Sequence, residues 1–228
     1  MTPRKHTAEG GRATANAILN AADEVLAEGG IAALSARVVA ERAGVNKALV
    51  FYHFKSKAGL LHAVLQRYYR AHLEALRHAF ADDGAPIGTR VHRMVDAYFD
   101  FIAANHRYPR VVQQQVSVGN GASVRASLSP MLHWFERVLG PITPAMGPLA
   151  ARHFFLTFSG MVTNYFTYGP VMAETWAHDP LSAEGIAERR AHVHWMVRVV
   201  LAGLASEKHQ QGDGHGDAHR GGDGGDDL

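Results

Sequence analysis

Residues 34–57 read LSARVVAERAGVNKALVFYHFKSK and contain two short helical stretches that meet at Ala43-Gly44-Val45. Ser35 is a candidate N-cap for the first stretch and Asn46 for the second, because both side chains can accept a hydrogen bond from a free backbone amide. Two short helices joined by so tight a turn have the spacing of a helix-turn-helix, whose second helix enters the major groove of DNA. The same spacing also occurs in helical proteins that bind no DNA.

Further helices are expected on both sides of this stretch. Residues 12–28 place apolar side chains at helical spacing and end at Gly29-Gly30, and Ser56 can cap a helix with an inward-facing apolar stripe. Another helix is expected to begin at Ser129-Pro130, because proline suits the first turn. Helices are also expected at residues 87–105, 108–117, 148–168 and 182–205. Strand-like alternation of useful length is absent, so the fold class is predicted to be all-α.

The composition predicts a globular protein inside the cell. The chain has 228 residues, of which 47% are hydrophobic, and its formal net charge is +2. Residues 1–60 hold eight Lys or Arg against five Asp or Glu, whereas residues 206–228 hold two against six. The chain contains no cysteine, which fits a reducing cytoplasm. Residues 1–11 lack an apolar signal core, and no run approaches the roughly 20 apolar residues that span a bilayer. A cytoplasmic protein without a membrane partner is therefore expected.

Enzymatic and metal-binding functions are not indicated. The sequence has no glycine-rich phosphate loop, no GxSxG nucleophile elbow and no paired carboxylates at a spacing suited to acid-base catalysis. His192 and His194 are two residues apart on an expected helix and point to different faces, and no HExxH motif occurs. We therefore expect no enzyme, no cofactor and no metal site.

Loop chemistry at Asp82-Asp83-Gly84-Ala85-Pro86 marks the best candidate for a domain boundary. The tail is rich in Gly, Asp and His and cannot bury enough apolar surface to offset its ordering entropy. The expected parts are a flexible N-terminal arm at 1–11, a helix-turn-helix domain at 12–56, a connecting helix at 57–81, a second helical domain at 82–206 and a disordered acidic tail at 207–228.

The residues make the helix-turn-helix prediction specific. The segment from Leu34 to Lys57 resembles the DNA-binding signature of the TetR family of bacterial regulators. Its most telling parts are Ala43-Gly44-Val45 and residues 51–57, FYHFKSK, which look like that family's recognition helix and its junction to the fourth helix. The close resemblance covers about residues 12–65, and beyond residue 80 it extends only to helix number and length.

This resemblance implies a sequence-specific DNA-binding transcriptional regulator. We expect a repressor that a small, largely apolar ligand releases from a palindromic operator, with ligand binding displacing the helix after Ser56. The alternative is a helical ligand-binding or scaffold protein without specific DNA binding.

Ten residues are predicted to contact DNA. The N-capping residues can present helix-terminal amides to a phosphate, and the basic and aromatic donors around the recognition helix suit phosphate oxygens. Arg37 and Lys47 are long enough to reach guanine edges. Ala48 and Leu49 can lie against thymine methyl groups, although the family often has glycine and threonine there. The predicted contacts are Ser35, Arg37, Asn46, Lys47, Ala48, Leu49, Tyr52, His53, Lys55 and Lys57.

The second domain is predicted to dimerise and to bind the ligand. In a TetR-like protein the last two helices, here 148–168 and 182–205, form a four-helix bundle with their partners, which gives a homodimer. The resemblance also implies a cavity with an aromatic and methionine wall, although such stripes are more often plain core. The candidates are Tyr98, Phe99, Trp134, Phe155, Phe158, Met161 and Tyr165. His133, His153, Asn164 or Gln114 are expected to anchor polar groups of the ligand.

Overall fold

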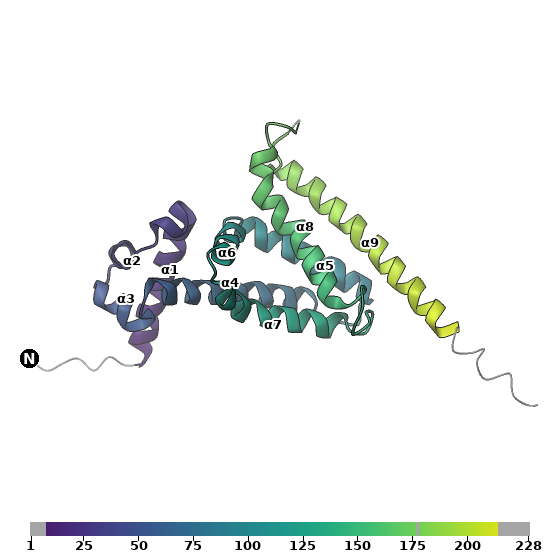
Figure 1. Ribbon diagram of the computed structural model, residues 1–228, viewed down its shortest axis with the longest axis horizontal. Coiled ribbons are helices and arrows are strands. Elements are labelled where there is room, and N and C mark those ends of the chain that lie inside the picture. The colour runs from purple at the N-terminus through teal and green to yellow at the C-terminus, as the bar shows by residue number, and fades with distance from the viewer. Residues whose placement is uncertain (1–7, 177, 214–228) are drawn as a thin grey trace, which may run out of the picture.

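The computed structural model describes residues 8–176 and 178–213, which form helices joined by short connections, with no strand among them (Figure 1). The prediction of an all-α fold is confirmed. The helices are α1 (Ala8–Ala33), α2 (Ala36–Arg42), α3 (Lys47–Phe54), α4 (Lys57–Ala79), α5 (Ile87–Ala104), α6 (Tyr108–Ser117), α7 (Gly121–Leu139), α8 (Ala151–Met172) and α9 (Ala183–Asp213).

Helices α1, α2 and α3 and the first half of α4 surround one hydrophobic core, which we call the N-terminal unit. Ile18 of α1, Val39 of α2, Val50 of α3 and Leu60 of α4 meet there and are each at most 2% exposed. Burial of such side chains stabilises a fold by about 1.5–3 kcal/mol each. Because α2 and α3 are only two turns long, this shared core rather than helix propensity holds them at a fixed angle.

Helix α4 runs through both halves of the molecule (Figure 1). Its first half places Leu61 and Val64 in the core of the N-terminal unit, and its second half places Leu73 and Leu76 in a larger core built with α5, α7 and α8. Within this second body, α9 packs chiefly on α5 and runs along the outside of the molecule. The long helix therefore joins the helix-turn-helix directly to the second body.

The boundaries of three helices differ from the sequence-based expectation. Helix α7 begins at Gly121 and contains Pro130, so the prediction that a helix starts at Ser129-Pro130 is wrong. Burial of Val124 and Met131 on either side of the proline outweighs the hydrogen bond that proline cannot make. Helix α1 begins at Ala8, inside the expected arm, and α9 continues to Asp213, inside the expected tail. The rest of the arm and tail, at 1–7 and 214–228, lies outside the described residues.

Candidate nucleic-acid interface

The three predicted N-caps of the N-terminal unit are present. Ser35 Oγ accepts a hydrogen bond from the Val38 amide at 3.2 Å, and Asn46 Oδ1 accepts one from the Ala48 amide at 2.8 Å. Ser56 Oγ likewise accepts from the Gly59 amide at 3.0 Å. Each cap satisfies one amide and leaves other helix-terminal amides of the same turn free of an intrahelical partner. The phosphate contacts expected of Ser35 and Asn46 stay predictions.

The turn between α2 and α3 has the backbone that its glycine allows. Gly44 has φ 64°, in the left-handed region that a residue with a Cβ rarely adopts. Directly after it, the Val45 amide donates to the Ala40 carbonyl at 3.0 Å and closes the turn. Gly44 is therefore needed for its conformation, and the turn fixes α3 relative to α2.

The junction between α3 and α4 depends on a glycine that sequence reasoning missed. A Cβ on Gly59 would lie 2.1 Å from the Phe54 carbonyl oxygen, so only glycine lets the first turn of α4 pack on the end of α3. Lys55, in the same junction, has φ 65° and is the one non-glycine residue at positive φ among the described residues. Its Nζ donates to the Tyr52 carbonyl at 2.8 Å. The sequence did contain a signal for this close packing, because a glycine stands in the first turn of a helix whose other residues favour helix formation.

The outer face of α3 carries side chains suited to DNA. Tyr52 is 69% exposed, so it is not a core aromatic residue. Lys47 and Ala48 are exposed beside it, and the Nζ of Lys47 lies 5.8 Å from the centre of the Phe51 ring. Val50 faces the opposite way and is 2% exposed. The helix therefore presents a cationic and aromatic face to solvent while its other face is held by the core.

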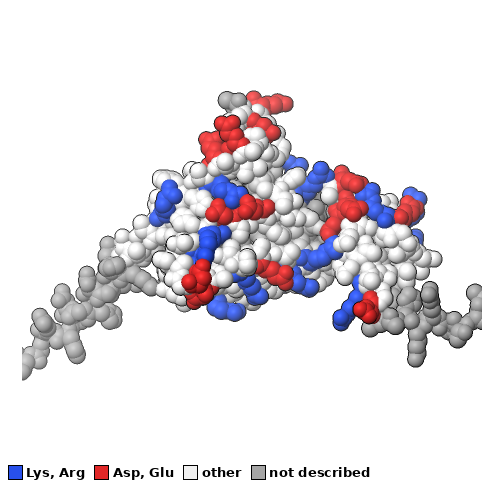
Figure 2. All heavy atoms as spheres, turned by 180° about the vertical axis from the view of Figure 1, so that it is seen from behind, with Lys and Arg blue, Asp and Glu red and all other residues white. Residues whose placement is uncertain are grey.

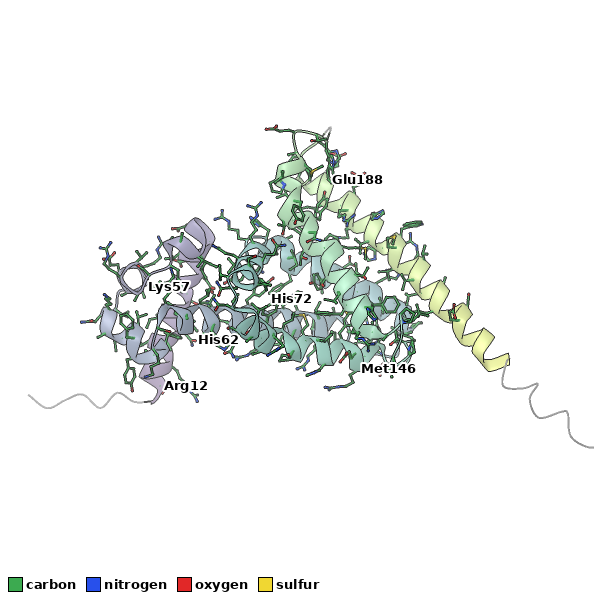
Figure 3. The ribbon with its side chains drawn as sticks, in the orientation of Figure 1. Arg12, Lys57, His62, His72, Met146 and Glu188 are labelled. Carbon is green, nitrogen blue, oxygen red and sulfur yellow. The ribbon has the colours of Figure 1, made fainter. Side chains whose placement is uncertain are left out.

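Besides Lys55, four predicted contact residues are placed less favourably or are already engaged. Leu49 packs against the core of the N-terminal unit, and His53 is half-buried. Arg37 is exposed and pairs with Glu41 of its own helix at 3.2 Å. Lys57 lies at the start of α4 (Figure 3), where its Nζ donates to the Ile31 carbonyl of α1 at 3.0 Å. Lys57 therefore also ties α4 to α1, a role that the sequence did not indicate.

Charges of both signs are mixed at the end of the molecule formed by α1, α2 and α3 (Figure 2). Arg42 of α2 reaches two carboxylates of α1, Glu28 at 2.6 Å and Glu24 at 3.8 Å. The hydrogen bond from Arg42 lowers the pKa of the Glu28 carboxyl. These pairs neutralise acidic residues that would otherwise repel a phosphate backbone.

The second body contains a narrow apolar slot between α5, α7, α8 and α9. Its volume is about 70 Å³, and its wall includes Val95, Phe154 and Leu201 together with Phe158 and Met161 from the predicted set. The other five candidates do not line this slot. Tyr98, Phe99, Trp134 and Phe155 belong to the packed core, and the Tyr165 hydroxyl donates to the carbonyls of Pro180 and Gly185.

The expected polar anchors of a ligand are at the surface, and a different polar group is buried. His133, His153, Asn164 and Gln114 are all exposed. His72, halfway along α4 (Figure 3), is 2% exposed, and its Nε2 has no hydrogen-bond partner among the described residues. Its ring stacks on Phe101 at 4.3 Å, and burial lowers its pKa to about 3. His72 is therefore a neutral imidazole with an unused nitrogen inside an aromatic core.

The described part of the chain shows neither a membrane-spanning helix nor a metal-binding cluster. None of its helices is long and apolar enough to cross a membrane. It holds no group of three or more His, Asp or Glu side chains arranged to hold a metal ion.

A capped helix-turn-helix on an all-helical body is typical of DNA-binding regulatory proteins. Similarity to known proteins identifies the type of helix-turn-helix more closely. Residues 18–64 match the family model described as bacterial regulatory proteins, tetR family. The chain is 35% identical over 95 residues to the HTH-type transcriptional activator FasR of Mycolicibacterium smegmatis, covering 42% of this chain and 43% of that one. It is 47% identical over 64 residues to the HTH-type transcriptional repressor Rv3405c of Mycobacterium tuberculosis, covering 28% and 34%. The matched segments thus span less than half of either relative.

The fold of most of the described residues agrees with solved structures. The transcriptional regulator FadR of Bacillus subtilis, solved in complex with stearoyl-CoA, superposes with a TM-score of 0.60 at 19% identity, covering 83% of this chain and 96% of that one. Residues 18–64 therefore carry a DNA-binding region of the TetR type.

Proposed function

We propose that this protein is a sequence-specific DNA-binding transcriptional regulator that acts as a homodimer. The observation that carries the proposal is the face of α3, where Lys47, Ala48 and Tyr52 are exposed on a helix held by a capped turn. Basic side chains at its ends suit phosphates, and the residues between them suit base edges. The names of the curated relatives, one an activator and one a repressor, support regulation of transcription in general.

The dimer is proposed to form through α8 and α9. Leu156, Tyr168 and Val171 of α8 are each more than half exposed, and so are Trp195 and Val199 of α9. Large apolar side chains at this density on neighbouring helices favour a protein interface over free surface. A two-fold arrangement would place two copies of α3 about 35 Å apart, one turn of DNA.

The effector is proposed to be a small, largely apolar molecule that enters the slot between α5 and α9 and releases the protein from DNA. The slot wall is formed by aliphatic, aromatic and methionine side chains, with Thr157 as its polar member. At about 70 Å³ the slot must widen to hold an acyl chain, and α9, which packs chiefly on α5, is the helix that we propose to shift. The stearoyl-CoA bound to the FadR neighbour supports an acyl ligand.

DNA binding is tested by titrating the full chain against DNA from beside its own coding region. Specific retention is expected, and replacing Lys47 by Ala should lower the salt dependence by about one counterion. Arg137→Ala is the matched control, because Arg137 is an exposed cation on α7. If the wild type retains no DNA above a scrambled sequence, the chain is the helical binding or scaffold protein without specific DNA binding.

The effector proposal is tested with acyl-CoA of increasing chain length added to the protein–DNA complex. Long chains should release the DNA, and Leu201→Trp, which fills the slot, should abolish release while DNA binding remains. Unchanged DNA affinity at saturating acyl-CoA would refute this ligand class.

A further inference from the structure

Helices α1, α4 and α6 meet at one carboxylate, Asp23 of α1. Tyr108, the first residue of α6, donates its hydroxyl hydrogen to Asp23 Oδ1, and Arg67 of α4 pairs with Asp23 Oδ2. We call Asp23, Arg67 and Tyr108 the Asp23 junction. It joins the N-terminal unit to the first residue of a helix that belongs to the second body.

The junction is anchored by several directional contacts. Arg67 also donates to Asn20 Oδ1 at 2.8 Å and to the Leu19 carbonyl at 2.9 Å, so its guanidinium is committed to α1. The Tyr108 ring stacks on Tyr68 of α4 at 4.2 Å with an angle of 5° between the ring planes. Burial raises the pKa of Tyr108 to about 12, so its hydroxyl keeps the proton that it donates at neutral pH.

Helix α6 carries the junction toward the slot and the proposed dimer face. Two residues after Tyr108, Arg110 donates to the Thr167 carbonyl of α8 at 3.1 Å. Tyr108 itself packs against the cores of both the N-terminal unit and the second body. A shift of α8 is therefore transmitted to α1 through one short helix with a polar contact toward each side.

A cleft beside the junction limits the packing that could replace it. The cleft has a volume of about 590 Å³ and lies between α1, α4 and the start of α6, with Glu28, Phe101 and Arg107 in its wall. Beyond the cleft, Val111 of α6 is buried in the core of the N-terminal unit, an apolar contact that sets no direction by itself. The bonds to Asp23 supply the directional contacts that this apolar packing lacks.

We propose that Tyr108 is a positioning residue for DNA recognition: its hydrogen bond to Asp23 fixes the orientation of the helix-turn-helix on the second body. In a dimer this orientation sets the distance between the two copies of α3, and hence the half-site spacing that the protein accepts. The consequence for DNA rests on the proposed function, whereas the orientation of one unit on the other does not.

The first test measures orientation without DNA. The chain has no cysteine, so Ala48→Cys on α3 and Arg137→Cys on α7 give two specific spin-label sites on exposed positions. Labelled full chain diluted with unlabelled protein reports the distance between the sites within one protomer. Tyr108→Phe keeps the stacked ring and loses the hydrogen bond, and it should broaden the distance distribution about twofold.

Tyr69→Phe is the matched control, because Tyr69 lies on the α7 side of α4 beside Met131 and away from α1. It should leave the distribution unchanged. An unchanged distribution in Tyr108→Phe as well would overturn the proposal, whatever the protein does with DNA.

The second test measures the consequence for DNA with palindromes whose half-sites are separated by stepwise longer spacers. The wild type should prefer one spacer, and Tyr108→Phe should reduce that preference about tenfold while its affinity for an isolated half-site stays the same. An equal loss of affinity for every spacer would show that Tyr108 acts on folding alone and would contradict a positioning role. If wild type binds no DNA, the proposed function fails and the spin-label result still decides the junction.

Discussion

Helices α2, α3 and α4 begin in a different way from helices α5 to α8 of the second body. Helices α2, α3 and α4 each begin with a Ser or Asn side chain that accepts a backbone amide hydrogen. Helices α5, α6, α7 and α8 begin without any such side-chain bond. In the second body α9 is the exception, because Ser182 Oγ accepts from the Gly185 amide at 3.1 Å. The first group is specified by local bonds, and the second by burial of long helices against one another. Local bonds suit a small unit with a fixed outer face, and burial without such bonds suits a body that we propose to reshape around a ligand.

The comparison predicts that the same substitution has opposite effects in the two regions. Gly59→Ala in the first turn of α4 should destabilise the fold by about 3 kcal/mol, because the new Cβ meets the Phe54 carbonyl oxygen. Gly88→Ala in the first turn of α5 should stabilise by about 0.5 kcal/mol, since its Cβ would make an ordinary contact with Leu201 at 3.7 Å. Urea unfolding of both variants at one protein concentration measures the difference. Equal effects would mean that the α3–α4 junction is not tightly specified.

The buried histidine of the second body predicts a dependence of stability on pH. His72 stays neutral in the folded protein because burial lowers its pKa to about 3, whereas in the unfolded chain it takes up a proton below its ordinary value of 6.5. The unfolded state therefore gains protons as the pH falls, and the free energy of unfolding should drop by about 2 kcal/mol between pH 7 and pH 5 from this residue.

His72→Leu should remove this part of the dependence, and His133→Leu, at an exposed position, should leave it unchanged. Urea unfolding at the two pH values gives the comparison. Parallel pH dependence in wild type and His72→Leu would show that His72 is protonated in the folded state or reached by water.

The contrast between the regions also explains how much of the fold was predictable. The caps at Ser35 and Asn46 and the turn at Gly44 follow from a few neighbouring residues, and the structure contains all three. At Ser129-Pro130 a local signal of the same kind was misleading, because Val124 and the following turns are buried and keep α7 continuous. Local chemistry decides a helix end only where packing does not oppose it.

The residues of the candidate sites also divide into those that local sequence predicts and those that depend on contacts between distant residues. Exposure of Lys47 and Tyr52 follows from the apolar stripe of a short helix, whereas the bond from Lys57 to Ile31 joins residues far apart in the sequence. In the second body the helical stripe predicts that Tyr98 faces inward, and it does. The apolar stripe of a helix does not show whether empty space remains beside an inward side chain. Residues that line a cavity and residues that fill the core could therefore not be distinguished from the sequence.

The smallest predicted effect separates capping from DNA contact at α3. Asn46→Ala should destabilise the protein by about 1 kcal/mol through loss of the bond to the Ala48 amide. Asn46→Asp keeps an oxygen at this position and should leave stability unchanged, but its negative charge should weaken DNA binding about tenfold. Thermal unfolding and DNA titration of both variants measure the two effects. Full DNA affinity in Asn46→Asp would place the phosphate backbone away from the start of α3.

We propose that α3 reads a half-site while the second body fixes the distance between two half-sites. Selecting genomic fragments that bind the wild-type protein, and reading their sequences, tests both parts at once. We expect an enriched inverted repeat whose half-sites lie about one turn of DNA, 10–10.5 base pairs, apart at one spacing. Failure to enrich any sequence, or enrichment of single half-sites without a partner at fixed spacing, would contradict it.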